Sequence, residues 1–149
     1  MSIAVHVSVE GERIPLARSR VSEIARRVLE AEHVNDAMLS ITFVGGRAMA
    51  ALNRRHLGRR GTTDVIAFGF GRSAPRSPVV GDIYIAPDVA RANALTHGAR
   101  VREELIRLIV HGVLHVLGYD HAEDETRNES EMWARQERLV ARVMKGAAA

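Results

Sequence analysis

The chain has 149 residues, which is long enough for one domain with a hydrophobic core and short for two. It contains no cysteine, no apolar run that could span a membrane and no signal-peptide pattern at residues 1–10, which excludes disulfide bonds and predicts a cytoplasmic protein. The formal net charge is +3, and 20 of the 21 basic residues are arginine, whose charge persists far above neutral pH.

Strand and helix patterns alternate in the first half of the chain. Apolar residues at every second position predict the first strand, and helical spacing from Val21 to Leu29 predicts an amphipathic helix with Ser19 as its N-cap. Gly45-Gly46 is expected to form a turn before a second helix that ends near Gly58. The predicted elements are strands over 3–9 and 38–44 and helices over 19–32 and 47–57.

The second half adds two strands and ends in helices. A loop over 71–78, with two prolines and two serines, separates the strands, and Pro87 suits the first turn of a helix that Gly98 closes. The predicted elements are strands over 62–70 and 79–86 and helices over 87–98, 101–117 and about 125–144, the last packing through Met132, Leu139, Val140 and Val143.

These elements predict one domain over residues 1–149, because the sequence has no linker, internal repeat or low-complexity tract beyond its alanine tail. We expect the fold class to be α/β (mixed α+β), a small four-stranded mixed sheet packed with about five helices.

Three histidines lie within eleven residues around the end of the predicted helix over 101–117. His111 and His115 are four residues apart, so their side chains share one face of a helix. Gly118 easily adopts the left-handed conformation that ends a helix, and the reversal turns His121 back toward the first two. The spacing predicts one metal ion per chain, held by His111, His115 and His121 at the end of a central helix.

The ligand set favours zinc with an open coordination position. Three neutral imidazoles fill three of the four positions that zinc prefers, and a closed structural site normally adds a fourth protein ligand, most often the cysteine that this chain lacks. We therefore expect water in the fourth position, as in catalytic zinc sites. Imidazole also suits nickel, copper and iron, so zinc is preferred here for its geometry and its lack of redox chemistry.

The spacing His-x-x-x-His-x-x-Gly-x-x-His is shared with the metzincin proteases, but one residue argues against peptide hydrolysis. Those enzymes carry a glutamate general base directly after the first histidine, where this chain has Gly112. The base must come from elsewhere in the chain or from the substrate. Asp120, beside the third histidine, is the candidate catalytic residue, and it is equally suited to capping a turn or orienting an imidazole.

Charge is distributed unevenly along the chain. Residues 47–76 contain seven arginines and one acidic residue, Asp64, whereas acidic residues outnumber basic ones beyond the histidine motif. A basic segment separated from an acidic one suggests that a polyanion binds to one side of the molecule.

The chain resembles the YbeY family of bacterial rRNA maturation factors, which are metal-dependent endoribonucleases. Four segments carry the resemblance in the family's order: Leu52-Asn53, Thr63-Asp64-Val65-Ile66-Ala67-Phe68, Gly81-Asp82-Ile83-Tyr84-Ile85, and the histidine block ending Gly118-Tyr119-Asp120-His121. The resemblance implies a zinc ion on the three histidines. It also implies action on single-stranded RNA in rRNA maturation, including the 3′ end of small-subunit rRNA, and in ribosome quality control.

The same resemblance implies the ribosomal small subunit as partner, with no DNA and no membrane. At the position of Leu57, many family members carry an arginine that is thought to assist catalysis or to bind phosphate. A leucine can do neither. We assign no catalytic arginine. The candidate RNA-binding residues are the neighbouring arginines Arg54, Arg55, Arg59 and Arg60.

RNA suits a site without a dedicated glutamate, because its 2′-hydroxyl is a nucleophile within the substrate. Asn53 and Thr63 are candidate hydrogen-bond donors to substrate, whereas Asp64 and Asp82 are expected to close turns rather than orient a ligand. Most of the aromatic residues fall in apolar runs typical of a core. We therefore expect arginine–phosphate contacts to outweigh base stacking and to make affinity strongly salt-dependent.

Three functional hypotheses follow from the sequence. The first is a zinc endoribonuclease, and the second is a zinc hydrolase acting on an amide or ester. The third is a non-catalytic ribosome-assembly protein in which the metal only fixes the histidine turn. The first two differ in substrate, and the third predicts that loss of the ligands lowers thermal stability and ribosome association together.

Overall fold

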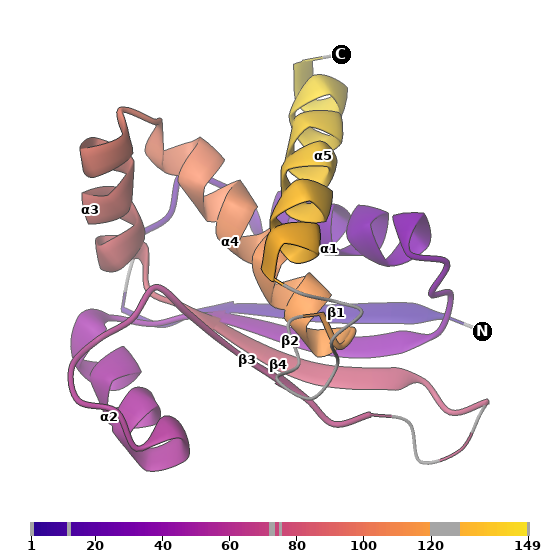
Figure 1. The fold of residues 1–149 in the computed structure, drawn as a ribbon, viewed down its shortest axis with the longest axis horizontal. Helices are drawn as coiled ribbons and strands as arrows, with labels where there is room; N and C mark the ends of the chain where they lie inside the picture. Colours follow the sequence, from indigo (N-terminus) through magenta and orange to yellow (C-terminus); the bar gives the residue numbers. More distant parts are fainter. Residues whose placement is uncertain (1, 12, 72–73, 75, 120–128, 149) are drawn as a thin grey trace.

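The computed structural model describes residues 2–11, 13–71, 74, 76–119 and 129–148 (Figure 1). Within these ranges no helix is long and apolar enough to cross a membrane. The elements are β1 (Ile3–Val9), α1 (Arg18–Ala31), β2 (Ala37–Phe43), α2 (Gly46–Leu57), β3 (Val65–Gly69), β4 (Val79–Ile85), α3 (Pro87–His97), α4 (Val101–Val116) and α5 (Glu129–Ala148).

The four strands form one mixed sheet in the order β1-β2-β4-β3. β1 pairs with β2 and β2 pairs with β4 in parallel, whereas β3 pairs with β4 antiparallel. Parallel neighbours need a crossover connection, which α1 provides between β1 and β2. The predicted α/β fold with a four-stranded mixed sheet is therefore confirmed.

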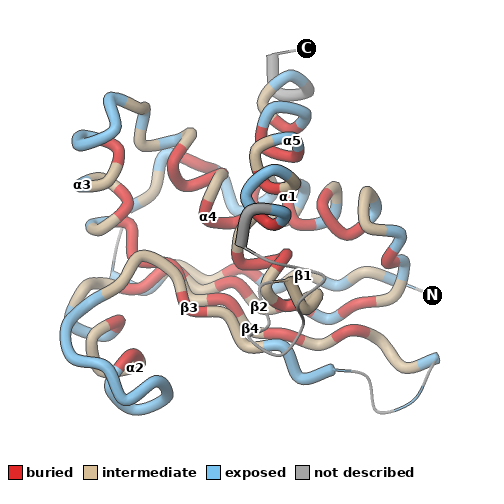
Figure 2. Tube along the Cα trace, in the orientation of Figure 1, coloured by how far each residue is buried: buried red, intermediate tan, exposed pale blue. Residues whose placement is uncertain are grey.

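Helix α4 is the central helix of the fold. It contacts β3 and β4 beneath it and the helices α1, α3 and α5 around it. A helix enclosed in this way is apolar over most of its circumference. Figure 2 shows buried segments along α4 and along the strands that it covers. Its fully buried residues are Leu105, Ile106, Ile109, Val110, Val113 and Leu114.

Two glycines let the C-terminal half of α4 lie close to the sheet. A Cβ atom at Gly112 would be 2.7 Å from Cγ2 of Ile83, and one at Gly69 would be 2.7 Å from the backbone oxygen of Val116. Such distances leave no room for a side chain, so glycine is required for this approach. The half of α4 that carries the histidines is thereby packed directly on β3 and β4.

Helix α2 covers the opposite face of the sheet from α4 (Figure 1). Alternation along β4 turns Gly81 and Ile83 toward α4, so Asp82 and Tyr84 face the other way. A small second core lies between α2 and this other face. It consists of Val44, Met49, Ile66 and Ala86, with Leu52, Phe68, Tyr84 and Val89 packed against it.

Some element boundaries differ from the predictions. Helix α1 begins at Arg18, with Ala17 as its N-cap, so the prediction of Ser19 as N-cap is wrong. The helix is fixed by its buried apolar face rather than by a capping side chain. Strand β3 is shorter than predicted, because only Val65–Gly69 pairs with β4.

The last helix packs on the core as predicted. It runs to residue 148 rather than 144, and its predicted first turn at 125–128 lies outside the described residues. The four apolar residues that the sequence assigned to its packing face are all buried: Met132, Leu139, Val140 and Val143.

Candidate metal centre

His111 and His115 lie one turn apart on α4. Their ring centroids are 4.7 Å apart, and the ring planes are inclined at 60°. Both side chains are half-buried, because the helix is packed against the sheet on the side of Gly112 and leaves the histidine face partly open. The structure therefore brings the two imidazoles together as their spacing predicts.

The chain reverses directly after these histidines. Gly118 has a φ of +95°, and its N–H donates to the carbonyl of His115 at 2.9 Å. The N–H of Tyr119 donates to the carbonyl of Leu114 at 3.1 Å, which completes the hydrogen-bond pattern of a glycine-terminated helix. The predicted role of Gly118 in ending the helix is confirmed.

Tyr119 fixes the direction in which the chain leaves α4. Its hydroxyl donates to Glu32, just beyond the end of α1, and Arg135 of α5 donates to the same carboxylate. Asp120 and His121 follow outside the described residues, so their roles stay predictions. Within the described ranges, no three histidine, cysteine, aspartate or glutamate side chains gather into a group that could hold a metal.

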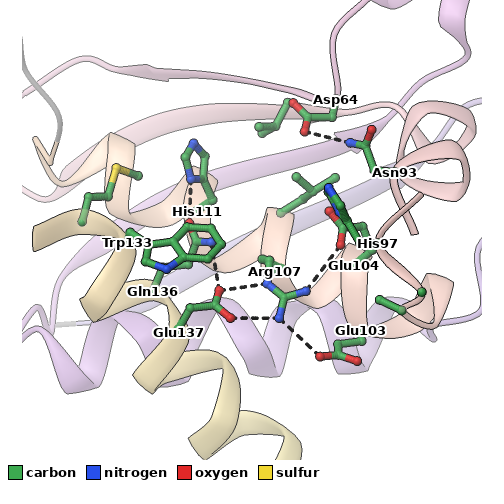
Figure 3. A pocket seen from close by; sticks show the side chains of 15 residues that line it. Asp64, Asn93, His97, Glu103, Glu104, Arg107, His111, Trp133, Gln136 and Glu137 are labelled. Atoms are coloured by element: carbon green, nitrogen blue, oxygen red, sulfur yellow. Dashed lines mark hydrogen bonds and ion pairs between the residues drawn. The ribbon is translucent and has the colours of Figure 1, made fainter. Parts of the chain in front are cut away.

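Gln136 of α5 contacts the first histidine (Figure 3). Its amide oxygen lies 2.7 Å from Nδ1 of His111, and its amide nitrogen donates to Oε2 of Glu137 at 3.2 Å. The Gln136 side chain is buried, with 3% of its surface exposed. Because Nδ1 is engaged, Nε2 is the ring nitrogen of His111 that is left for a metal.

Arg107 of α4 anchors this contact from the other side. Its guanidinium donates to both oxygens of Glu137, through Nε at 2.8 Å and through Nη2 at 2.9 Å, and it also contacts Glu103 and Glu104. The hydrogen bond from Arg107 lowers the pKa of Glu137, and the hydrogen bond to Glu137 raises the pKa of Arg107. Both groups are therefore charged at neutral pH, and they tie α4 to α5.

A groove of about 1050 Å³ opens beside His111. Its walls come from α3, α4, α5 and the start of β3. On one wall, Asp64 accepts a hydrogen bond from Asn93 at 3.2 Å. Acidic side chains outnumber the one arginine in the lining. The polar and aromatic lining residues are Asp64, Asn93, His97, Glu103, Glu104, Arg107, His111, Trp133, Gln136 and Glu137 (Figure 3).

Asn53 and Asp82 each have a role that differs from the predicted one. Asn53 is 4% exposed on α2, and its amide donates to the carbonyl of Gly61 at 3.0 Å. The prediction that Asn53 donates to substrate is therefore wrong, because the amide holds the loop that follows α2. Asp82 does not close a turn: it lies within β4 and accepts from the hydroxyl of Ser40 at 2.8 Å.

The other two residues of this group lie just before β3. The backbone carbonyl of Asp64 accepts the N–H of Ala86 at 2.9 Å, which extends the pairing of β3 with β4 by one residue, and its carboxylate faces the groove, so a turn-closing role for Asp64 stays a prediction. Thr63 is half-buried beside it, and its contact with substrate stays a prediction.

The candidate RNA-binding arginines are exposed, as is Leu57 among them. They lie on α2 and the turn after it: Arg54, Arg55, Arg59 and Arg60. Because α2 covers the opposite face of the sheet from α4, these side chains and the histidine pair lie on different faces. The edge strand β3 offers a polyanion one path from one face to the other.

The aromatic residues are only partly in the core. Phe43 is fully buried, and three others pack at core margins: Phe68, Tyr84 and Tyr119. Phe70 and Trp133 are 62% and 59% exposed, so most but not all of the aromatic residues belong to the core, as expected. Phe70 follows the last paired residue of β3, and Trp133 lies on the groove side of α5.

Comparison with known proteins gives matches over most of the chain. A family model described as "Endoribonuclease YbeY" matches residues 6–144. Proteins named Endoribonuclease YbeY are similar to this chain in Frankia alni, with 39% identity over 93% of this chain and 82% of the relative, and in Salinispora tropica, with 44% identity over 81% and 84%. The Geobacillus kaustophilus protein of that name is 35% identical over 94% of this chain and 97% of its own.

A solved structure supports the fold. The solution structure of TM1509 from Thermotoga maritima matches with a TM-score of 0.67 and 23% identity, over 97% of this chain and 91% of that one. Fold and site together define an α/β protein with a histidine pair at the end of its central helix. The chain belongs to the YbeY family, so the resemblance drawn from its four sequence segments is confirmed.

Proposed function

We propose that this protein is a zinc-dependent endoribonuclease that cleaves single-stranded RNA. The supporting observation is the imidazole pair of His111 and His115 beside an open groove, in a chain whose relatives are named endoribonucleases. The proposed setting is rRNA maturation and ribosome quality control in the cytoplasm, including the 3′ end of small-subunit rRNA. The ribosomal small subunit is the proposed partner.

The chemistry of the donor set fits zinc. Metal-bound histidines nearly always give their second ring nitrogen to a nearby acceptor, and the amide oxygen of Gln136 is such an acceptor for His111. His111 and His115 would hold the ion together with His121, the predicted third ligand. When bound, zinc supplies a Lewis acid that stabilises negative charge on a phosphodiester.

The described side chains support a division of the RNA between two surfaces. Acidic residues outnumber Arg107 in the groove, so without a bound metal the groove suits a base, which can stack on Trp133, better than a phosphate. The exposed arginines of α2 attract the sugar-phosphate backbone beyond the β3 edge. The 2′-hydroxyl of RNA provides the nucleophile in a site where Gly112 replaces a glutamate base. Asp120 is the proposed proton acceptor.

Purified protein and an unstructured RNA test this function. We expect cleavage that disappears after chelation and returns with zinc, and a weaker reaction on the same sequence in a duplex. Ester and amide substrates test the alternative hydrolase, and their cleavage without that of RNA would refute the proposal. Absence of RNA cleavage above the metal-stripped control would favour the assembly-protein hypothesis.

Replacing Arg55 and Arg59 together by alanine is expected to flatten the salt dependence of RNA affinity. Each phosphate contact with single-stranded nucleic acid contributes about 0.7 to the slope of log Kd against log salt, so the loss of two lowers the slope by about 1.4. Fluorescence anisotropy with labelled RNA over a salt series measures it. The control replaces Arg26 of α1 and Arg142 of α5, two exposed arginines away from α2. An unchanged slope in the Arg55/Arg59 variant would place the RNA elsewhere.

Trp133 is the only tryptophan of the sequence, so its fluorescence reports on the groove. We expect single-stranded RNA to quench this fluorescence in metal-free protein, because a base stacks on the exposed indole. Trp133→Ala should weaken binding by about 1–3 kcal/mol, the usual contribution of one stacked base. Phe70→Ala is the control, since Phe70 is equally exposed but does not line the groove. Unquenched fluorescence at saturating RNA would exclude the groove as a base site.

A further inference from the structure

We propose that Gln136 is a positioning residue that holds His111 in the tautomer with its proton on Nδ1, and that the Arg107–Glu137 ion pair fixes the direction of the Gln136 amide. The importance of this tautomer rests on the proposed function, because the freed Nε2 is the atom that would bind zinc. The tautomer itself is a property of the metal-free protein.

The first step is the place of Gln136 in the core. The residue falls on the buried stripe of α5, between Met132 and Leu139, where the other residues are apolar. A buried amide is costly unless its oxygen and nitrogen both find partners. Here the oxygen contacts His111 and the nitrogen contacts Glu137, so both ends of the amide have partners.

The second step is the direction of the amide. The Glu137 carboxylate receives two hydrogen bonds from Arg107, at 2.8 and 2.9 Å, which keep it ionised and therefore able only to accept. The lowered pKa of Glu137 agrees with this charge. A reversed amide would place the Gln136 oxygen against an anion and would leave two NH₂ hydrogens facing His111. The ion pair thus selects the orientation in which the oxygen faces the histidine.

The third step is the proton on His111. An amide oxygen can only accept, so the 2.7 Å contact requires a proton on Nδ1. In a neutral imidazole the other nitrogen then carries the lone pair. The chain from Arg107 through Glu137 and Gln136 therefore prepares Nε2 as a metal donor before any metal binds, and avoids the cost of choosing the tautomer on binding (Figure 3).

Three variants test this arrangement. Gln136→Met removes the acceptor at similar volume, Gln136→Glu keeps an acceptor, and Glu137→Gln removes the anion that directs the amide. Arg138→Met is the control for loss of a neighbouring charge on α5, since the Arg138 guanidinium contacts the helix backbone. Backbone NMR spectra establish that each variant is folded.

The decisive readout is heteronuclear NMR of the His111 ring nitrogens in isotope-labelled, metal-free protein. We expect a single Nδ1-protonated form in the wild type, Gln136→Glu and Arg138→Met, and a mixture of tautomers in Gln136→Met and Glu137→Gln. Zinc affinity, measured by competition with a chromophoric chelator, should fall about 10- to 100-fold in Gln136→Met and be largely retained in Gln136→Glu.

The outcomes separate this proposal from the proposed function. A wild-type His111 protonated on Nε2, or an unchanged tautomer in both Gln136→Met and Glu137→Gln, overturns the positioning role whatever RNA assays show. A mixture of tautomers in Glu137→Gln, with a single tautomer in Gln136→Met, refutes the role of Gln136 as the acceptor. Failure of the wild type to bind zinc or cleave RNA refutes the proposed function, and the tautomer result still stands.

Discussion

Substitution of His115 by alanine is expected to abolish RNA cleavage while the protein stays folded. The imidazole lies 4.7 Å from that of His111, on the partly open face of α4, and alanine is a strong helix former. If His115 is a zinc ligand as proposed, its loss removes several kcal/mol of charge stabilisation on the phosphodiester, which corresponds to a rate reduction of about 10³-fold or more. Initial cleavage rates of an unstructured RNA measure it, with circular dichroism to verify the fold.

Metal analysis makes the same variant more informative. Freshly isolated wild-type protein should carry close to one zinc ion per chain, and His115→Ala should carry little. His6→Ala is the matched control, because His6 is exposed on β1 and contacts only Ser8 among the bonds described. The same measurement on His121→Ala tests the third predicted ligand. Full RNA cleavage by a zinc-free His115→Ala protein would disprove the metal-dependent mechanism.

The elements that position the histidines could be predicted from the sequence because their signals are local. The four-residue spacing places both imidazoles on one helix face, and Gly118 ends the helix through its own conformation. The strands follow from short-range alternation. The prediction of Ser19 as N-cap was wrong because burial of the apolar face of α1, rather than a capping side chain in its first turn, determines where that helix begins.

The network around Gln136 depends on contacts between segments far apart in sequence. Arg107 and His111 are on α4, whereas Gln136 and Glu137 are on α5, and spacing along the chain does not reveal which helices will pack together. One signal was nevertheless present. Gln136 is a polar residue at a position where the periodicity of Met132, Leu139 and Val143 predicts an apolar one. A buried amide at such a position needs a partner, which is a reason to look for one.

Packing between distant segments also explains where the predicted exposure of side chains was wrong. Asn53 was interpreted as a substrate donor although it follows Met49 by one helical turn and so shares its buried face. The general expectation that most aromatic residues are buried does not hold for Trp133, because the buried stripe of α5 passes through its neighbour Met132. In both cases the helix face, rather than the residue type, determines which side chains reach the groove.

Introducing the missing metzincin glutamate by Gly112→Glu is expected to unfold the protein rather than create a peptidase. Gly112 faces β4, away from the histidine side of α4, and its substituted Cβ would be 2.7 Å from Ile83. Even Gly112→Ala should lower the free energy of unfolding by about 1–3 kcal/mol through overpacking, and glutamate adds an unpaired buried charge. The absence of a glutamate base is thus a consequence of how closely the helix that carries the histidine pair packs on the sheet.

Urea unfolding of Gly112→Ala measures this effect, and two further variants identify its cause. Gly46→Ala is the control, because a Cβ at the start of α2 would meet nothing within 4 Å, and it should leave stability unchanged or slightly raised. Ile83→Ala costs stability by itself but removes the atom that a Cβ at residue 112 would strike. The double variant should therefore be more stable than the sum of the single losses predicts. Strict additivity would mean that α4 relieves the contact by moving away from β4, and that the glycine is not what holds the histidine pair against the sheet.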